Sequence, residues 1–534
     1  ASEKLPNKAT PKDIIIEKIL ERYPPLRTQI KLAGKLEDQQ IPYIQARLDG
    51  VGENDIRHAH HPMMRNAPSS SDMDIVFVGT ASCTPGFTRG VSCTALRLQW
   101  RRDNSRDNAQ TKPPQMDNKN KGKNLDTTYV SSNTPGTWIF DVGECTQLQI
   151  QKTGSIKPGK ISKIFITHAH GDHSFGLPGL LCLMGQDRDR DAPPVEIYGP
   201  EGLRMWLRVA IRYSVSRIVP PYRVHEIMDI PMAPEWDQGR WKNGRYFYQL
   251  QKEGGRGEQW GRKGLAGEDP GSWISRAPML NLELNSQFGE VDVGRDIYPS
   301  YDHPKCVDGA PIWEIEDEGD VKVHAAPMSH GVPCVGYVVE EKSKPGRLRN
   351  DIVEPIAKKN MAALKEAGMR HPMKVLALIK TLPEGGSYTF PDGVVVHQSD
   401  VVEKTREGRK IVICGDSADC RAIAGLAEGA DILVHEATNT YLKGIDKDTN
   451  FQVVTREAKI HGHSTPHMAG TFAQQIGARR LLLNHFSARY KGDQSAESMS
   501  LMLRIEGQAM QASGLSEENL AAAWDFMVLP IPQK

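Results

Sequence analysis

Short runs of β-branched and aliphatic residues recur along the chain from residue 74 onward, and most end in a turn rich in Gly, Asp or His. Runs of this kind, bounded by turn residues, predict buried strands. We expect them at Ile75–Gly79, Trp138–Gly143, Ile161–Thr167, Val195–Gly199, Val321–Ala325, Val335–Val339, Lys410–Gly415, Asp431–His435 and Arg480–Asn484. Helical patterns lie between several of them, as at Pro466–Ile476, where a proline follows Ser464-Thr465. Strands mixed with helices in this way predict a layered α/β domain.

The α/β pattern is flanked by two terminal segments. Residues 1–72 are expected to be an N-terminal extension in which Asp13–Arg22 forms one short amphipathic helix that ends before Pro24-Pro25. The α/β domain itself is expected to span residues 73–495. A helix at Ala496–Met510 then opens a C-terminal helical segment, 496–534.

Two stretches interrupt the domain. Residues 101–136 are polar and predict a surface insertion. Residues 235–315 are rich in Gly, and four of the nine tryptophans lie between residues 236 and 273, interleaved with Arg and Lys. Such tryptophans could stack on nucleic acid. Because the segment also carries many acids, we favour a loop cluster that packs its own aromatic residues.

Composition excludes several classes of protein. The chain of 534 residues has 67 Lys+Arg against 66 Asp+Glu, a net charge of +1, so it is not basic overall. No apolar run approaches the roughly 18–20 residues that span a bilayer, so we expect no membrane segment. Eight cysteines lie far apart without a Cys-x-x-Cys pair, which indicates reduced thiols in a reducing intracellular compartment. Cytosol, nucleus and an organelle reached after loss of a presequence all remain open.

The segment Ile164–His173 carries the densest group of metal ligands. His168 and His170 follow a predicted strand and alternate to the same side of an extended chain. The turn at Gly171 then redirects Asp172 and His173 toward a second ion. Imidazole with carboxylate is a ligand mixture that suits Zn²⁺. Another cluster, His58-Ala-His60-His61, lacks a carboxylate and follows no strand, and we expect it to be solvated.

Four ligands cannot hold two metal ions, and three more candidates follow other predicted strands. They are His330, Asp416 and His485. Each follows the carboxyl end of its strand, where α/β layers gather their active sites. Each alone would be an ordinary surface or capping residue, but the set in this order indicates a dinuclear site.

The pattern His168-x-His-x-Asp-His173 followed by distant His, Asp and His resembles the metallo-β-lactamase superfamily. Within it, the chain is similar to the tRNase Z family. The motifs that carry the resemblance are Val78-Gly-Thr80 with Pro85 and Thr88-Arg-Gly90, Phe140-Asp-Val-Gly-Glu144, His173-Ser-Phe-Gly-Leu-Pro-Gly179, Ile197-Tyr-Gly-Pro-Glu-Gly-Leu203, His330-Gly-Val-Pro-Cys-Val-Gly-Tyr337, His435-Glu-Ala-Thr438, His463-Ser-Thr465 and His485-Phe-Ser-Ala-Arg-Tyr490. The resemblance implies an αββα sandwich, two zinc ions per chain, precursor tRNA as substrate and a homodimer.

The resemblance also implies a role for each ligand. One zinc would be held by His168, His170 and His330, and the other by Asp172, His173 and His485, with Asp416 bridging. A shared, zinc-activated water would attack the phosphodiester in line. Asp172 would orient that water or accept its proton, and His463, oriented by Glu436, would protonate the leaving O3′. From the residues alone, His463 could instead be a helix-capping neighbour of Ser464-Thr465.

A local basic patch supports an RNA substrate. Residues 342–380 hold ten basic and three acidic side chains, a net +7 in a chain of net +1. The resemblance places a tRNA-binding arm in this region, at 342–393. We expect its RNA-binding residues to be Lys358, Lys359, Lys365, Arg370, Lys374 and Lys380. Where the family's arm has a Gly-Pro-containing basic tip, this chain has Gly368-Met-Arg-His-Pro372-Met-Lys374.

The sequence thus predicts a zinc-dependent endoribonuclease that removes the 3′ trailer from precursor tRNA after the discriminator nucleotide and leaves a 3′-hydroxyl. Two alternatives remain open at this point. One is a dinuclear zinc hydrolase of the same superfamily that acts on a small ester. The other is a non-catalytic scaffold subunit that has kept the fold.

Overall fold

A computed structural model describes residues 11–24, 26–27, 55–98, 136–188, 192–231, 288–343, 346–383 and 385–534. The chain divides into two compact units. The larger comprises residues 1–339 and 410–532, and the smaller comprises 340–409 with 533–534. Residues 101–135 of the predicted insertion 101–136, and most of the predicted insertion 235–315, lie outside the described residues. In the part described, no helix is long and apolar enough to cross a membrane.

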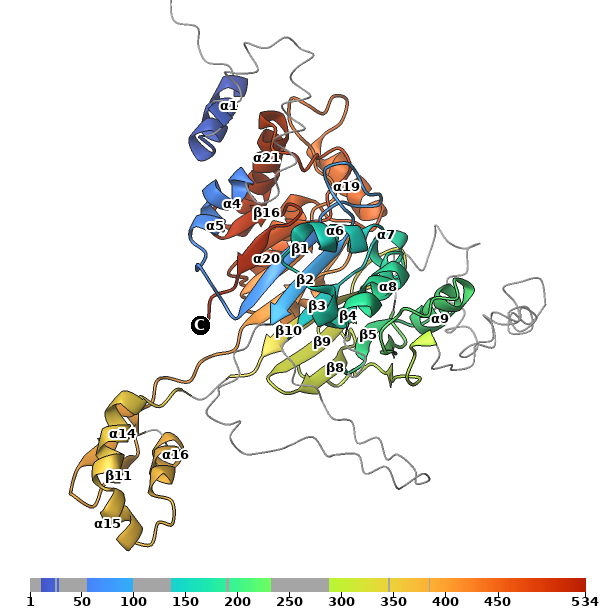
Figure 1. Cartoon of the computed structure of the whole chain (residues 1–534). Coiled ribbons are helices and arrows are strands. Elements are labelled where there is room, and N and C mark those ends of the chain that lie inside the picture. Colours follow the sequence, from blue (N-terminus) through green and yellow to red (C-terminus); the bar gives the residue numbers. More distant parts are fainter. Residues whose placement is uncertain are drawn as a thin grey trace, which may run out of the picture. The chain divides into compact units, whose positions relative to one another are not determined.

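The larger unit contains two sheets (Figure 1). Among the described residues, the first has eight strands in the order β17-β1-β2-β3-β4-β5-β6-β7. Their bounds are β1 Met73–Gly79, β2 Cys93–Leu98, β3 Thr137–Phe140, β4 Ile161–Phe165, β5 Val195–Pro200, β6 Tyr222–Ile227, β7 Asp296–Ile297 and β17 Val528–Pro530. The pairs from β3 to β7 are parallel, whereas β17, β1, β2 and β3 pair antiparallel.

The second sheet has seven described strands in the order β16-β15-β14-β13-β10-β9-β8. Their bounds are β8 Trp313–Glu318, β9 Val321–Pro327, β10 Val335–Glu341, β13 Lys410–Ile413, β14 Ile432–Glu436, β15 Leu481–Asn484 and β16 Leu520–Ala522. Strands β13 to β16 are parallel to one another. Parallel strands end at one common edge, so residues that follow them are brought together there.

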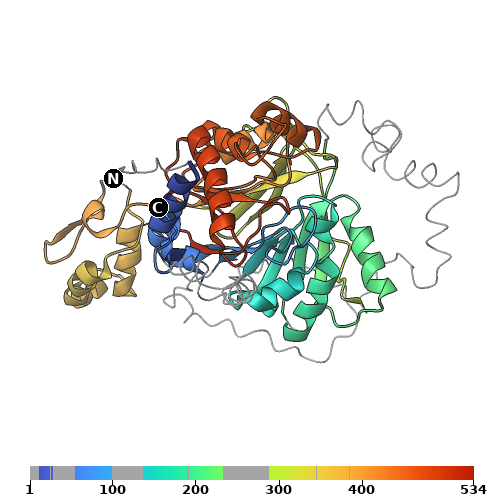
Figure 2. The same cartoon turned by 90° about the horizontal axis from the view of Figure 1, so that it is seen from above.

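Helices cover the outer face of each sheet (Figure 2). Over the first sheet lie α6 Thr146–Thr153, α8 Leu177–Asp187 and α9 Leu203–Tyr213. Over the second lie α18 Ala424–Ala427, α20 Pro466–Gln475 and α21 Ala496–Ser513. The other helices described in this unit are α1 Pro11–Arg22, α4 Ile56–His60, α5 Pro62–Arg65, η2 Pro158–Lys160, α7 Gly171–Ser174, η5 Arg421–Ile423 and α19 Phe451–Ile460.

Three apolar cores hold these four layers together. The central core joins the inner faces of both sheets through aromatic residues such as Phe165, Tyr198, Trp313 and Tyr337, all fully buried. The other two cores lie between each sheet and its own helices. Alternate residues of one strand therefore serve two cores, as expected for a sheet buried on both faces. The predicted αββα metallo-β-lactamase sandwich is confirmed.

The C-terminal segment differs from its prediction. Residues 496–534 form the expected helix, but they then supply β16 to one sheet and β17 to the other. Strand β17 pairs with β1, so Leu529 lies opposite Ile75. Each strand is only three residues long, which is too short for alternation to reveal. The segment is part of the sandwich and not an appendage to it.

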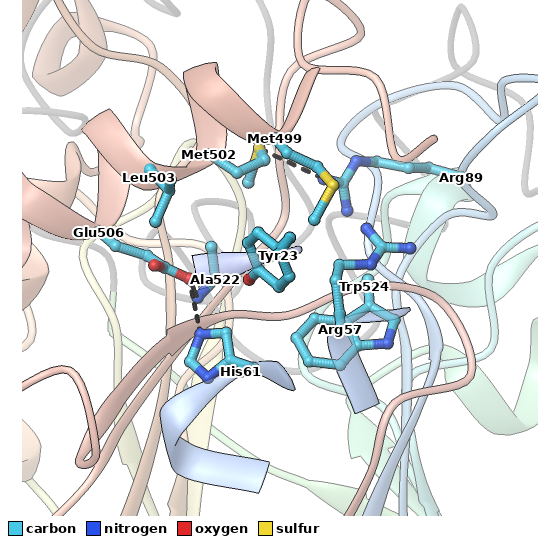
Figure 3. Close-up of a pocket in the computed structure, with 10 residues that line it drawn as sticks. All are labelled: Tyr23, Arg57, His61, Arg89, Met499, Met502, Leu503, Glu506, Ala522 and Trp524. Carbon is cyan, nitrogen blue, oxygen red and sulfur yellow. Dashed lines mark hydrogen bonds and ion pairs between the residues drawn. The ribbon is translucent and has the colours of Figure 1, made fainter. Parts of the chain in front are cut away.

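The N-terminal extension also packs on the sandwich, and the expectation that its histidines are solvated is wrong for two of them. His61 is 1% exposed and its Nε2 lies 3.1 Å from Glu506 Oε1 on α21. The ring of His58 packs edge-on against Trp524, with ring centroids 5.3 Å apart. Figure 3 shows His61, Glu506 and Trp524 around a small cavity beside Tyr23 of the extension. These contacts are non-local, so the spacing of the histidines did not reveal them.

The smaller unit has its own elements and its own core. Its helices are α14 Asn350–Lys359, α15 Met361–Glu366, η4 Pro372–Lys374, α16 Val375–Lys380 and α17 Gln398–Val401, and its hairpin pairs β11 Ser387–Thr389 with β12 Val395–His397. Buried residues from these elements, including Val353, Leu364, Ile379 and Phe390, form one apolar cluster. The unit therefore extends beyond the predicted arm, 342–393, at both ends.

Candidate metal centre

All seven predicted metal ligands lie at the carboxyl ends of strands. His168, His170, Asp172 and His173 follow β4, and the last two lie within the single turn of α7. His330 follows β9, Asp416 follows β13, and His485 follows β15. Strands of both sheets thus deliver ligands to one site, although the ligands span more than 300 residues of sequence.

The first group of ligand atoms belongs to His168, His170 and His330. The Nδ1 atom of His170 lies 3.1 Å from His168 Nε2 and 3.2 Å from His330 Nε2. His168 and His330 are buried, whereas His170 is exposed. The group therefore opens to solvent on the side of His170.

The second group belongs to Asp172, His173 and His485. The Nε2 atoms of the two histidines lie 3.2 Å apart, and Asp172 Oδ2 lies 3.3 Å from His485 Nε2 and 3.5 Å from His173 Nε2. Asp416 connects the two groups. Its carboxylate oxygens lie 3.8 Å from His168, 3.4 Å from His173 and 3.3 Å from His485.

Hydrogen bonds on the far side of two rings fix which nitrogen faces the centre. The Nδ1–H of His330 donates to the Gly462 carbonyl at 2.8 Å, because a carbonyl can only accept. The Nδ1–H of His173 donates to Asp141 Oδ2 at 2.7 Å. In each ring Nε2 is therefore the nitrogen directed inward, and it is the nitrogen that would bind a metal once it carries no proton.

Two hydroxyl groups fix the remaining buried rings in the same way. Thr438 donates to Glu436 Oε2 at 2.5 Å, so its oxygen accepts the Nδ1–H of His485 at 2.9 Å. Thr167 donates to Asp141 and accepts the Nδ1–H of His168 at 2.9 Å. Both relays end on a carboxylate, a second layer of support that is typical of metal-binding histidines.

The donor set fits a pair of metal ions. The inward ring nitrogens of His173 and His485 lie 3.2 Å apart, and those of His168 and His170 lie 3.1 Å apart. At these distances their lone pairs repel one another unless a cation or proton lies between them. Burial lowers the pKa of His168, and burial also lowers the pKa of His330 to about 4, so these rings are neutral at pH 7. Neutral imidazoles and carboxylates without a thiolate form a ligand set that suits zinc.

A histidine–glutamate pair lies beside the metal ligands. His463 Nδ1 is 3.1 Å from Glu436 Oε2 and 3.7 Å from Asp416 Oδ2. Burial would lower the pKa of His463, but the Glu436 carboxylate and then Asp416 raise it. Burial would likewise raise the pKa of Glu436, yet His463 and then His485, whose Nδ1 lies 3.8 Å from Glu436 Oε2, lower it to about 2. An imidazolium that faces a metal centre can donate a proton there.

The capping alternative for His463 does not match the structure. Thr465 is the N-cap of α20, where its hydroxyl accepts from the Met468 N–H. The side chain of His463 points instead at Glu436, and 22% of it is exposed.

Sequence reasoning missed the supporting residues Asp141, Thr167 and Thr438. Asp141 lies within the Phe140–Glu144 motif, and Thr438 lies within His435–Thr438. The sequence therefore showed both motifs, but not that these two residues support the metal-centre histidines. Another contact left no sequence trace, because it is a backbone amide. The N–H of Cys83 donates to Asp172 Oδ2 at 2.6 Å.

A third group of ligand-type atoms lies elsewhere in the larger unit. Side chains of His303, Glu314 and His324 bring their ligand atoms within 4.8 Å of one another. Glu314 and His324 are cross-strand partners on β8 and β9. Glu314 is exposed and the two histidines are half-buried, in contrast to the mostly buried set around Asp416.

The six predicted RNA-binding cations all lie in the smaller unit. Lys365, Arg370 and Lys374 are exposed, and Lys380 is half-buried. Lys358 and Lys359 are exposed but form ion pairs with Glu354 at 2.7 Å and Asp392 at 3.1 Å. The tip that departs from the family pattern begins at Gly368 (φ 90°), which ends α15, and continues into η4.

Comparison with known proteins finds close relatives in sequence, although no family model matches. The chain is 32% identical over 466 residues to zinc phosphodiesterase ELAC protein 1 of Bos taurus, an alignment that covers 86% of this chain and 99% of the relative. It is 29% identical over 449 residues to ribonuclease BN of Cronobacter sakazakii, covering 84% and 99%. Among solved structures, human tRNase Z short form matches with a TM-score of 0.43 and 24% identity, covering 86% and 99%.

Proposed function

The chain belongs to the tRNase Z family, and from this premise we propose how its own residues carry out the reaction. It is a zinc-dependent endoribonuclease that processes the 3′ ends of tRNA. We assign two zinc ions per chain, one to His168, His170 and His330 and the other to Asp172, His173 and His485. The observation that carries this assignment is the position of Asp416, within 4 Å of histidines from both groups.

Zinc supplies Lewis-acid chemistry at this site, since it lowers the pKa of water and neutralises charge on the phosphoryl oxygens. Asp172 is held in place by the Cys83 N–H and His485, with one oxygen directed into the second group. We assign to it the orientation of the attacking water and acceptance of its proton. The cut we propose follows the discriminator nucleotide of precursor tRNA.

Breaking the P–O3′ bond leaves an alkoxide that needs a proton, and the surroundings of His463 support it as the donor. Its imidazolium is stabilised by Glu436 at 3.1 Å and by Asp416 at 3.7 Å. Glu436 also accepts from Thr438 and from the Ser417 N–H, so its carboxylate is fixed in position. We therefore assign His463 as the general acid and Glu436 as its positioning residue, which leaves a 3′-hydroxyl on the tRNA.

Recognition of the tRNA body is assigned to the smaller unit. Lys365, Arg370 and Lys374 are exposed in this unit. Residues 342–380 hold ten basic side chains and only three acidic ones, so most of these positive charges are not balanced by nearby acids in the sequence. Charge of this kind binds phosphates in a salt-dependent manner. Because Lys358 and Lys359 already pair with carboxylates, we expect them to contribute less than the other cations. We also propose a homodimer, on the sequence resemblance alone, to be tested by light scattering.

The reaction is tested with a labelled precursor tRNA that carries a 3′ trailer. The zinc-loaded protein is expected to make a single cut after the discriminator nucleotide, and His170→Ala, which removes a ligand of the first zinc, is expected to make none. Hydrolysis of a small chromogenic phosphodiester without any cut in precursor tRNA would contradict the assigned substrate. Cleavage of precursor tRNA by the His170→Ala variant at the rate of the unmodified chain would contradict the assigned site.

A further inference from the structure

An exposed aromatic side chain lies beside the open side of the metal centre. Phe175 directly follows α7, the turn that holds Asp172 and His173, and 58% of it is exposed. Its ring lies against Gly171, since a Cβ added there would be 2.6 Å from Cδ2 and Cε2 of Phe175. Gly171 is the chain neighbour of His170, the one exposed ligand of the first group. The ring is therefore at the edge of the metal centre and not in the core.

A second ring supports Phe175 from a different helix. Trp206 of α9 stacks on Phe175 with ring centroids 6.4 Å apart and planes inclined by 22°. Trp206 is itself half-buried and packs against the core between the first sheet and its helices. Figure 1 shows α7, α8 and α9 along the same side of that sheet. The position of the Phe175 ring is thus fixed by packing while more than half of its surface is free to bind.

The metal ligands and the proton donor do not use this pair of rings. A single exposed Phe is ordinary on a protein surface, but this ring is held by packing next to the reacting groups, where it offers a flat apolar face to a ligand. Unpaired nucleotide bases present such a face, and single-stranded nucleic acid is generally bound by stacking on aromatic side chains. The nucleotides on either side of the scissile bond lie beyond the last base pair of the acceptor stem and are unpaired.

We propose that Phe175, supported by Trp206, stacks on an unpaired base next to the scissile phosphate. Phe175 is then a substrate-binding residue that fixes the register of the cut, and Trp206 is a positioning residue for it. The inference rests on the assigned endoribonuclease activity and deepens it by naming a base subsite. A flat ring accepts any base, so the subsite fixes position without selecting sequence.

The test combines protein variants with abasic RNA. Phe175→Ala is expected to lower kcat/KM on precursor tRNA by roughly 5- to 150-fold, the range found for loss of one stacked base. Phe175→Tyr, which keeps the ring, is expected to stay within about twofold, well inside that range. Trp206→Ala is expected to give an intermediate loss. Tyr213→Ala is the matched control, because Tyr213 is a 71% exposed aromatic residue on the same helix as Trp206.

Abasic substitution identifies the base. With the unmodified chain, removal of the base on one side of the scissile bond should lower kcat/KM by about the same factor as Phe175→Ala does on intact RNA. With Phe175→Ala, removal of that base should lower kcat/KM no further. Non-additivity of this kind reports a direct interaction. Hydrolysis of a chromogenic phosphodiester and the zinc content should be unchanged in the variant.

Three outcomes would overturn the proposal. In the first, Phe175→Ala lowers kcat/KM by the same factor on the intact substrate and on both abasic substrates. In the second, it lowers hydrolysis of the chromogenic ester by a similar factor. In the third, the variant has a changed oligomeric state. Failure of the endoribonuclease assignment would appear differently, as no cut by the unmodified chain on any of the RNAs.

Discussion

Asp141 gives the sharpest prediction about the metal centre, because both of its carboxylate oxygens accept hydrogen bonds and an amide in its place offers only one oxygen. Its Oδ2 accepts from His173 Nδ1 at 2.7 Å, while its Oδ1 accepts from the Thr167 N–H at 2.7 Å. An Asn at this position has one oxygen and one NH₂ group. Whichever way the amide is turned, one of the two donors must face another donor.

The predicted effect of Asp141→Asn follows from that mismatch. A buried donor left without an acceptor costs about 1–3 kcal/mol, and loss of such outer partners typically lowers metal affinity by about 10- to 100-fold. Because Asp141 holds His173 of the second group directly and His168 of the first group only through Thr167, we expect the second zinc to weaken by that factor and the first zinc by less. Asp141 has φ 59°, a conformation that Asn also tolerates, so the substitution adds no backbone strain.

Zinc release to a chromogenic chelator, followed at equilibrium, measures both affinities. Asp431→Asn is the matched control, because Asp431 is a buried carboxylate directly before β14, at the opposite end of the strand from the metal centre. We expect the affinity for one zinc to fall more than the affinity for the other in Asp141→Asn, and neither to fall in the control. Unchanged zinc affinity in Asp141→Asn would refute the reasoning, and so would equal weakening of both ions.

Two further predictions concern the proton donor and the N-terminal extension. His463→Ala should keep both zinc ions but lower kcat on precursor tRNA by roughly 10²- to 10⁴-fold, the usual contribution of a general acid. Loss of zinc in that variant would instead make His463 structural. Burial would raise the pKa of Glu506, but Arg22 and His61 lower it to about 2 from an ordinary 4.5. The lowered pKa stabilises the fold by on the order of 3 kcal/mol above pH 4.5, and this stabilisation is lost as the pH falls toward 2. In urea unfolding, the stability gap between the unmodified chain and Glu506→Gln should therefore narrow by about 1 kcal/mol between pH 7 and 3.5, and a gap independent of pH would contradict this origin.

The sequence was sufficient for those parts of the molecule that local pattern determines. Long buried strands such as β1 and β14 and the N-capped helix α20 were predicted within a few residues of their observed bounds. The seven predicted ligands are gathered in one place, because the ends of parallel strands within each sheet share an edge. There His168, after a strand of the first sheet, and His485, after a strand of the second, both lie within 4 Å of Asp416.

Other features depend on contacts that no local pattern carries. Strands β16 and β17 are three residues long and exist only because longer strands offer them an edge. His61 resembles a solvated histidine until α21 places Glu506 beside it. Thr438 looks like part of a short motif, and its function follows only from the rotamers of His485 and Glu436.

The most direct test of the central claim is an anomalous difference map at the zinc edge from crystals of the zinc-loaded protein. We predict two peaks in each chain, one among His168, His170 and His330 and the other among Asp172, His173 and His485, with Asp416 between them. A single peak in this region would contradict the account, as would zinc bound at His303, Glu314 and His324 while the site around Asp416 stays empty.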